Sequence, residues 1–185
     1  MTNIKKITTP ITKDMIKSLR AGDILAITGT IYTGRDAAHK KLVALIKENK
    51  PLPFDIKDSI LYYVGPTPAK PGKPIGSAGP TSSYRMDPYT PYLLAQGSLI
   101  SIGKGPRSQA IKEALVQYQG LYLSAIGGAA ALTADSIKQC DLIAYPELGA
   151  EAIYKLEVVD FFAVVTYDSY GNDLLETGIS QYQIK

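Results

Sequence analysis

The sequence has 185 residues, with one cysteine, one histidine and no tryptophan. The single cysteine, Cys140, excludes an intrachain disulfide and a metal cage built from cysteines. The single histidine, His39, excludes a multi-histidine metal site within the chain. We therefore expect no residue of this chain to bind a metal, and any metal chemistry must take its ligands from elsewhere.

Long apolar runs and clustered charge are also missing. No apolar run approaches the length that spans a bilayer, and residues 1–6 lack the apolar core of a signal peptide. The formal net charge is only +3, and the lysines and arginines are scattered. These features argue against a membrane or nucleic-acid partner and predict a cytoplasmic protein.

The remaining composition is ordinary for a globular protein, with 45% hydrophobic and 20% charged residues. The length suits one domain, and we see no internal repeat or boundary, so we expect residues 1–185 to form a single domain. Expected strands cover residues 23–28, 59–64, 99–102, 121–126, 142–145 and 156–167. Expected helices follow Thr12, Asp36, Thr90, Ser108 and Gly127. This alternation predicts an α/β fold with a sheet that is at least partly parallel.

The recurring unit is a strand, a glycine-rich polar loop and a helix. Such loops are expected at residues 29–36 and 103–106 and around Gly127, with residues 76–87 as a variant. Loops at strand ends are where small ligands bind in open α/β sheets. Asp36 is a plausible cap of its helix, whose free amides favour a nearby anion.

Loop 76–87 is the most distinctive of these. Its glycines let the backbone approach a ligand, and Thr81 and Arg85 would share a face if a short helix starts here. A hydroxyl beside a guanidinium suits a small carboxylate, which arginine binds with two hydrogen bonds. The alternative is a surface loop with a solvated arginine.

The roles of three further residues are weighed from the sequence in the same way. Lys104 follows a strand and is either an anion ligand or a solvated lysine, but Gly105 stands where a P-loop needs serine or threonine, so a nucleotide site is not expected. His39 suits a structural hydrogen bond better than catalysis. Cys140, near the end of an expected helical stretch, suits packing.

Taken together, the loops resemble the β subunit of class I fumarase over nearly the whole chain, in family order. The matching motifs are Gly29-Thr30 with Thr33-Gly34-Arg35-Asp36-Ala37-Ala38-His39, Pro53-Phe54-Asp55, Tyr63-Val64-Gly65-Pro66, Gly76-Ser77-Ala78-Gly79-Pro80-Thr81, Arg85-Met86-Asp87, Gly103-Lys104-Gly105, Gly127-Gly128-Ala129-Ala130, Glu147-Leu148-Gly149-Ala150-Glu151-Ala152 and an ending near Asp168.

The resemblance implies a swivelling β/β/α-type domain with a mixed sheet, either a separate β subunit or the C-terminal domain of a longer chain. It implies a hydro-lyase, fumarate hydratase, which reversibly hydrates fumarate to (S)-malate in the tricarboxylic acid cycle. The [4Fe–4S] cluster of that family is held by three cysteines of the partner α subunit, whose open iron acts as a Lewis acid. The implied holoenzyme is an α2β2 heterotetramer, active only as a complex.

Matching residue by residue, the resemblance implies that Arg35, Arg85 and Lys104 bind the carboxylates of a small dicarboxylate substrate. A desolvated dianion needs several cationic partners, which agrees with the reasoning from the loops. Thr81 falls at the proposed catalytic threonine, which acts in proton transfer together with an acidic residue of the other subunit.

Asp36 and His39 belong to the Arg35 motif and are expected to hold Arg35 in place. The sequence departs from the family at three positions. Ser82 stands where a second threonine is common and keeps the hydroxyl, and it is counted among the supporting residues. Tyr84 replaces a smaller residue and could narrow the pocket or lie at an interface, and Phe162 replaces a usual proline.

Two alternatives to a fumarase subunit stay open. A tartrate dehydratase β subunit would use the same carboxylate ligands, although the loop Thr33–His39 favours fumarase. A non-catalytic dicarboxylate-binding module would bind malate without any partner conferring turnover.

Overall fold

The computed structural model describes residues 4–184. The strands are β1 (Ile4–Thr8), β2 (Ile24–Thr33), β3 (Ile60–Tyr62), β4 (Ile100–Gly103), β5 (Leu121–Ser124), β6 (Ile137–Ala144) and β7 (Ile153–Tyr167). The α-helices are α1 (Lys13–Ser18), α2 (Asp36–Lys47), α3 (Thr90–Ala95), α4 (Gln109–Tyr118), α5 (Ala130–Ser136) and α6 (Leu174–Tyr182). Three 3₁₀ helices are η1 (Ser83–Met86), η2 (Gly127–Ala129) and η3 (Pro146–Glu151).

The strands form one mixed sheet whose pairings close on themselves. Strands β1 to β5 pair in parallel, in chain order, and β7 runs antiparallel to β5, β6 and β2. Because the long strand β7 pairs with both β5 and β2, the strands β2, β3, β4, β5 and β7 form a closed ring. Strands β1 and β6 extend this ring at its two sides. The fold is therefore α/β with a mixed sheet, as the sequence predicted.

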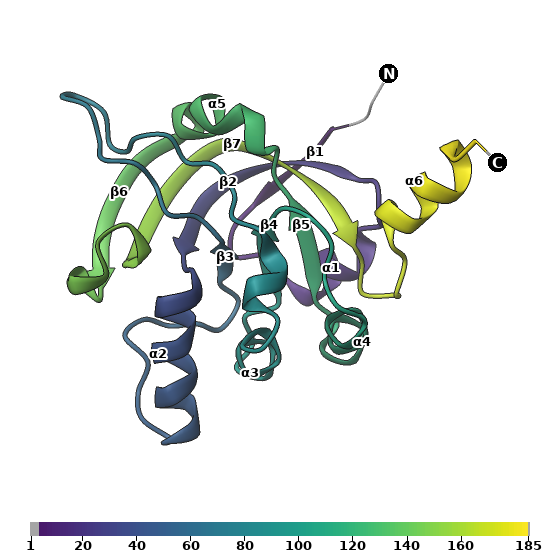
Figure 1. The fold of residues 1–185 in the computed structure, drawn as a ribbon, viewed down its shortest axis with the longest axis horizontal. Coiled ribbons are helices and arrows are strands. Elements are labelled where there is room, and N and C mark those ends of the chain that lie inside the picture. Colours follow the sequence, from purple (N-terminus) through teal and green to yellow (C-terminus); the bar gives the residue numbers. More distant parts are fainter. Residues whose placement is uncertain (1–3, 185) are drawn as a thin grey trace.

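The main hydrophobic core fills the inside of this ring. Its residues come from every strand of the ring, and include Ile27, Tyr62, Ile102, Leu123 and Phe161. Helices α2, α3 and α4 lie side by side outside the ring (Figure 1). They pack in two smaller apolar clusters, one against β3 and one against β5 and β7. The loops that follow the parallel strands lie together at one end of the ring.

Several expected local signals are present. The Thr12 hydroxyl accepts a hydrogen bond from the amide of Met15 and caps α1. Pro91 lies in the first turn of α3, and Gly97, at φ +91°, follows its end. Ser108 is the N-cap residue of α4, although its side chain makes no capping bond.

The prediction of a loop at residues 29–36 is wrong for the first half of that segment. Strand β2 continues to Thr33, and Gly29 lies in an irregularity of its pairing with β7. Gly29 adopts φ +120°, and a Cβ there would overlap the Thr9 side chain, so this glycine serves a bulge rather than a turn. Only Gly34 and Arg35 connect the strand to α2.

One more expectation needs correction. Cys140 lies on strand β6, half-buried against the main core, and not in a helical stretch. The helix expected after Gly127 forms as η2 and α5. No residue of α5 is fully buried, but Ala130 packs against Gly79 and Ala134 packs against the main core. Strand β1 and helix α6 are not among the expected elements. No helix within residues 4–184 is long and apolar enough to cross a membrane.

Candidate functional site

The loops that carry the candidate residues meet at one end of the ring. Because β2, β3, β4 and β5 run parallel, their carboxyl ends lie at the same edge. Arg35 follows β2, Gly65 follows β3, Lys104 follows β4 and Gly127 follows β5. The contacts described below join these loops to one another and to η1, which carries Arg85.

Arg35 lies against the loop after β3. A Cβ on Gly65 would overlap the Arg35 guanidinium, so the glycine makes room for this side chain. Arg35 Nη2 is 3.4 Å from Glu151 Oε1, and the two side chains are only partly exposed. Arg35 Nε is buried and has no hydrogen-bond partner within residues 4–184. Because Nε is buried, only the exposed part of the guanidinium can donate to a ligand or a partner chain.

Asp36 does not cap α2, contrary to the sequence-based expectation. It is the first residue of the helix, and its Oδ1 accepts a 2.9 Å hydrogen bond from Arg85 Nε. The free amide of Ala37 instead donates to Glu151 Oε2, at 3.2 Å. Glu151 thus serves both the helix N-terminus and Arg35, a role that the sequence pattern did not reveal. Asp36 links the Arg35 motif to η1.

His39 is fully buried one turn into α2. Its Nδ1–H donates to the carbonyl oxygen of Arg35 at 2.9 Å, and its ring edge packs against Tyr63. Burial lowers the pKa of His39 to about 4, so the ring is neutral at physiological pH. Its Nε2 has no partner in the part of the chain that the structure describes. These contacts fix the backbone at Arg35.

Thr81 lies outside η1, which begins at Ser83. The expected short helix therefore does not include Thr81, and Thr81 and Arg85 do not share a helical face. The Thr81 amide donates to the carbonyl of Tyr63 at 2.6 Å, which ties it to the end of β3. The next residue, Ser82, pairs with Lys104 in an isolated parallel bridge. Thr81 is therefore held between β3 and β4.

Lys104 is exposed at the end of β4. Its backbone is fixed, because its amide donates to Ser83 Oγ at 3.0 Å and its carbonyl accepts from the Ser83 amide at 2.9 Å. A Cβ on Gly127 would lie 3.7 Å from Lys104 Nζ, so the side chain reaches the loop after β5. None of the ion pairs among residues 4–184 includes Lys104. Its charge is available to an anion.

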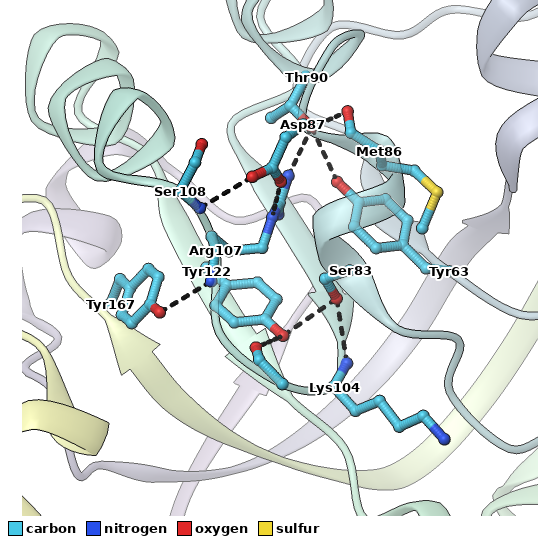
Figure 2. A network of polar contacts seen from close by, with 11 residues as sticks. Tyr63, Ser83, Met86, Asp87, Thr90, Lys104, Arg107, Ser108, Tyr122 and Tyr167 are labelled. Atoms are coloured by element: carbon cyan, nitrogen blue, oxygen red, sulfur yellow. Dashed lines mark hydrogen bonds and ion pairs between the residues drawn. The ribbon is translucent and has the colours of Figure 1, made fainter.

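Sequence reasoning missed a buried ion pair beneath these loops. Arg107 Nε lies 2.5 Å from Asp87 Oδ1, and the Arg107 side chain is 0% exposed. Figure 2 shows Asp87, directly after η1, and Arg107, after Lys104, pointing toward each other. Asp87 was noted only as part of a motif, and nothing in a single sequence indicates a pairing over this separation.

Two of the three positions that depart from the expected family pattern lie at the surface, and the third, Ser82, is half-buried. Tyr84 is 64% exposed within η1, and Phe162 is exposed on β7. Neither removes a cation from the site.

The donor set of this chain does not fit an iron–sulfur cluster. Such a cluster is held by several thiolates, and Cys140 is the one cysteine of the sequence. Within residues 4–184, no group of three histidine, cysteine, aspartate or glutamate side chains could hold a metal. The candidate residues are three cations and one threonine, and Glu151 and Asp36 are the carboxylate partners of the two arginines.

The fold and these loops define a class of protein: an α/β domain with cationic side chains on the loops at the carboxyl ends of its parallel strands. The chain belongs to the Fumarase C-terminus family, whose model matches residues 2–178.

Named relatives agree with this family. The chain is 49% identical over 154 residues to the anaerobic class I fumarate hydratase of Escherichia coli K12, covering 82% of this chain and 28% of that protein. It is 40% identical over 164 residues to fumarate hydratase 2 of Leishmania major, covering 88% and 29%. It is 39% identical over 172 residues to a Methanocaldococcus jannaschii protein provisionally named L(+)-tartrate dehydratase subunit beta, covering 90% and 88%. The chain thus spans less than a third of the two fumarate hydratases.

Proposed function

We propose that this chain is the β subunit of a hydro-lyase that reversibly hydrates fumarate to (S)-malate. The observation that carries the proposal is the gathering of Arg35, Arg85 and Lys104 on loops at one edge of the sheet. In this proposal residues 1–185 act as one domain that binds the substrate carboxylates.

The electrostatics favour a small dianion. Arg35 and Arg85 are each oriented by one carboxylate, Glu151 and Asp36, and each guanidinium has more donors than that partner uses. Lys104 adds a charge with no ion-pair partner among the described residues. A dicarboxylate that leaves water needs several such charge-assisted hydrogen bonds to offset its desolvation.

Thr81 is the proposed catalytic residue. Its backbone amide donates to the carbonyl of Tyr63, which holds this residue at the end of β3. We propose that its hydroxyl lies beside the bound substrate. A threonine hydroxyl is a weak base, so we propose that it moves a proton only together with an acidic residue of the partner. Asp36, His39 and Ser82 are proposed to hold the cationic residues and not to react.

The rest of the active site is proposed to lie on a partner α subunit. The longer fumarate hydratases contain sequence well beyond the matched segment, and the provisionally named β subunit is nearly the same length as this chain. We propose that this partner binds the [4Fe–4S] cluster, because the present chain has only one cysteine. We also propose that two copies of each chain assemble.

The alternative substrate is L(+)-tartrate. It is favoured by the similarity to the provisionally named tartrate dehydratase subunit, which matches this chain over almost its full length. Fumarate, malate and tartrate are all four-carbon dicarboxylates, so the same cations would bind any of them.

The experiment is a variant assay on the complete enzyme with fumarate, malate and L(+)-tartrate. Replacing Arg85 with alanine should lower kcat/KM at least about 100-fold, because a desolvated charged pair loses one partner. Arg20→Ala is the matched control. Arg20 is an exposed arginine in the loop before β2, whereas the candidate site lies beyond the other end of that strand, where Arg35 follows it. Near-normal activity of Arg85→Ala would refute the carboxylate assignment, and turnover of tartrate alone would select the alternative.

A further inference from the structure

A buried polar junction lies beneath the candidate site and the proposed function gives it no role. At its centre the Arg107 side chain donates two hydrogen bonds, from Nε to Asp87 Oδ1 at 2.5 Å and from Nη2 to Thr90 Oγ1 at 2.7 Å. The second Asp87 oxygen, Oδ2, accepts from the amide of Ser108 at 2.8 Å. A buried guanidinium and carboxylate lose much hydration, so this pair requires each of these bonds.

A second junction joins the same two segments a few residues away. The Ser83 hydroxyl and amide bond the backbone of Lys104 in both directions. The Tyr122 hydroxyl lies 3.0 Å from Ser83 Oγ and 2.8 Å from the carbonyl of Gly105. A Cβ on Gly103 would overlap the Ser83 hydroxyl, so the end of β4 and the start of η1 are in close contact.

The two junctions connect η1 and the turn after β4 at both ends. Ser83 and Asp87 flank Arg85 in the chain, and Lys104 and Arg107 bound the facing turn (Figure 2). Segments fixed at two points cannot slide or rotate relative to one another without breaking buried hydrogen bonds. The backbone positions of Arg85 and Lys104 are thereby coupled.

We propose that Asp87 and Arg107 are positioning residues that set the spacing between Arg85 and Lys104 to fit the two ends of a short dicarboxylate. The ligand class rests on the proposed function, whereas the coupling of the two segments rests on the contacts alone. A site that holds its charges ready at a fixed spacing loses less freedom on binding, and a shift of about 1 Å is enough to lower kcat/KM roughly 100-fold.

The test is Asp87→Asn in the complete enzyme. This change keeps the shape of the side chain but removes its charge, and it leaves one oxygen for the two donors Arg107 and Ser108. The expected result is a KM for the dicarboxylate raised about 10-fold or more in the folded enzyme. Loss of stability alone would lower the amount of active enzyme and leave KM unchanged.

Asp23→Asn is the matched control. Asp23 also combines an ion pair, to Lys5 at 2.6 Å, with a hydrogen bond from a backbone amide, that of Arg20 at 2.8 Å. It lies just before β2, at the opposite end of that strand from Arg35. We expect an unchanged KM for this variant.

Two further variants keep the test decisive. Arg107→Lys keeps the charge but cannot reach Asp87 and Thr90 together, so it should also raise KM. Ser83→Ala tests the second junction with a milder change if Asp87→Asn does not fold, and it should raise KM as well. A wild-type KM in folded Asp87→Asn, or in Arg107→Lys where Asp87→Asn does not fold, would overturn the proposal.

Amide hydrogen exchange separates this proposal from the proposed function. If the wild-type enzyme turns over neither fumarate nor tartrate, the substrate assignment fails, but the coupling is still testable. Asp87→Asn should then speed exchange in residues 83–87 and 104–108 together, while Asp23→Asn leaves both segments unchanged. Unaltered exchange in either segment of Asp87→Asn would overturn the coupling.

Discussion

The buried His39 makes the stability of this protein depend on pH in a calculable way. Burial lowers the pKa of the folded ring from 6.5 to about 4, because the loss of water around the charged ring outweighs the hydrogen bond to the Arg35 carbonyl. The unfolded state therefore binds more protons between pH 6.5 and pH 4, and stability falls as the pH falls through this window. A difference of about 2.5 pKa units corresponds to roughly 3 kcal/mol of unfolding free energy when the window has been crossed.

The perturbation is His39→Asn. The asparagine amide can replace Nδ1–H as the donor to the Arg35 carbonyl, but it cannot be protonated in this range. Packing against Tyr63 is lost, so the variant should be less stable at pH 7. Its stability should nevertheless decline less than that of the wild type between pH 7 and pH 4.5, by about 2 kcal/mol.

The assay is urea unfolding of both proteins at pH 7, 6, 5 and 4.5. Carboxylates titrate in both proteins, so the difference between the two curves isolates the contribution of His39. Parallel curves, with a constant difference at every pH, would refute the assignment of a neutral, buried histidine.

The remaining predictions concern two glycines. Gly65→Ala should displace the Arg35 guanidinium and lower kcat/KM of the complete enzyme about 10- to 100-fold, whereas Gly178→Ala, which meets no atom within 4 Å, should leave kcat/KM near wild type. Equal activities would contradict the contact between Gly65 and Arg35. Gly178→Ala, in α6, should raise the unfolding free energy by about 0.5–1 kcal/mol in thermal or urea unfolding, and a loss of stability would show that the helix is not formed as described.

Much of the fold could be predicted from local signals. Thr12 and Pro91 begin helices for reasons contained in a few neighbouring residues, and alternating strands and helices indicated the parallel part of the sheet. Gly29 misled the prediction, because a glycine at positive φ in a bulge has the same sequence signature as a turn. Closure of the ring depends on which strands β7 pairs with, and that is decided by distant parts of the chain.

The candidate site also has features that the sequence could predict and features that it could not. Glycine-rich loops at strand ends indicate the edge at which the parallel strands end, and the structure brings these loops together there. Only the resemblance to a family singles out Arg35, Arg85 and Lys104 together. The roles of Glu151 and the pairing of Asp87 with Arg107 depend on contacts between segments far apart in sequence. No local pattern of residues carries that information.

We propose that this chain supplies half of an active site. An anaerobic fumarate-hydration assay on the chain alone, on its cluster-loaded partner alone, and on the two together tests this directly. Turnover is expected only in the mixture. Equal turnover by either chain alone, or a verified complex that is inactive with both fumarate and L(+)-tartrate, would contradict it.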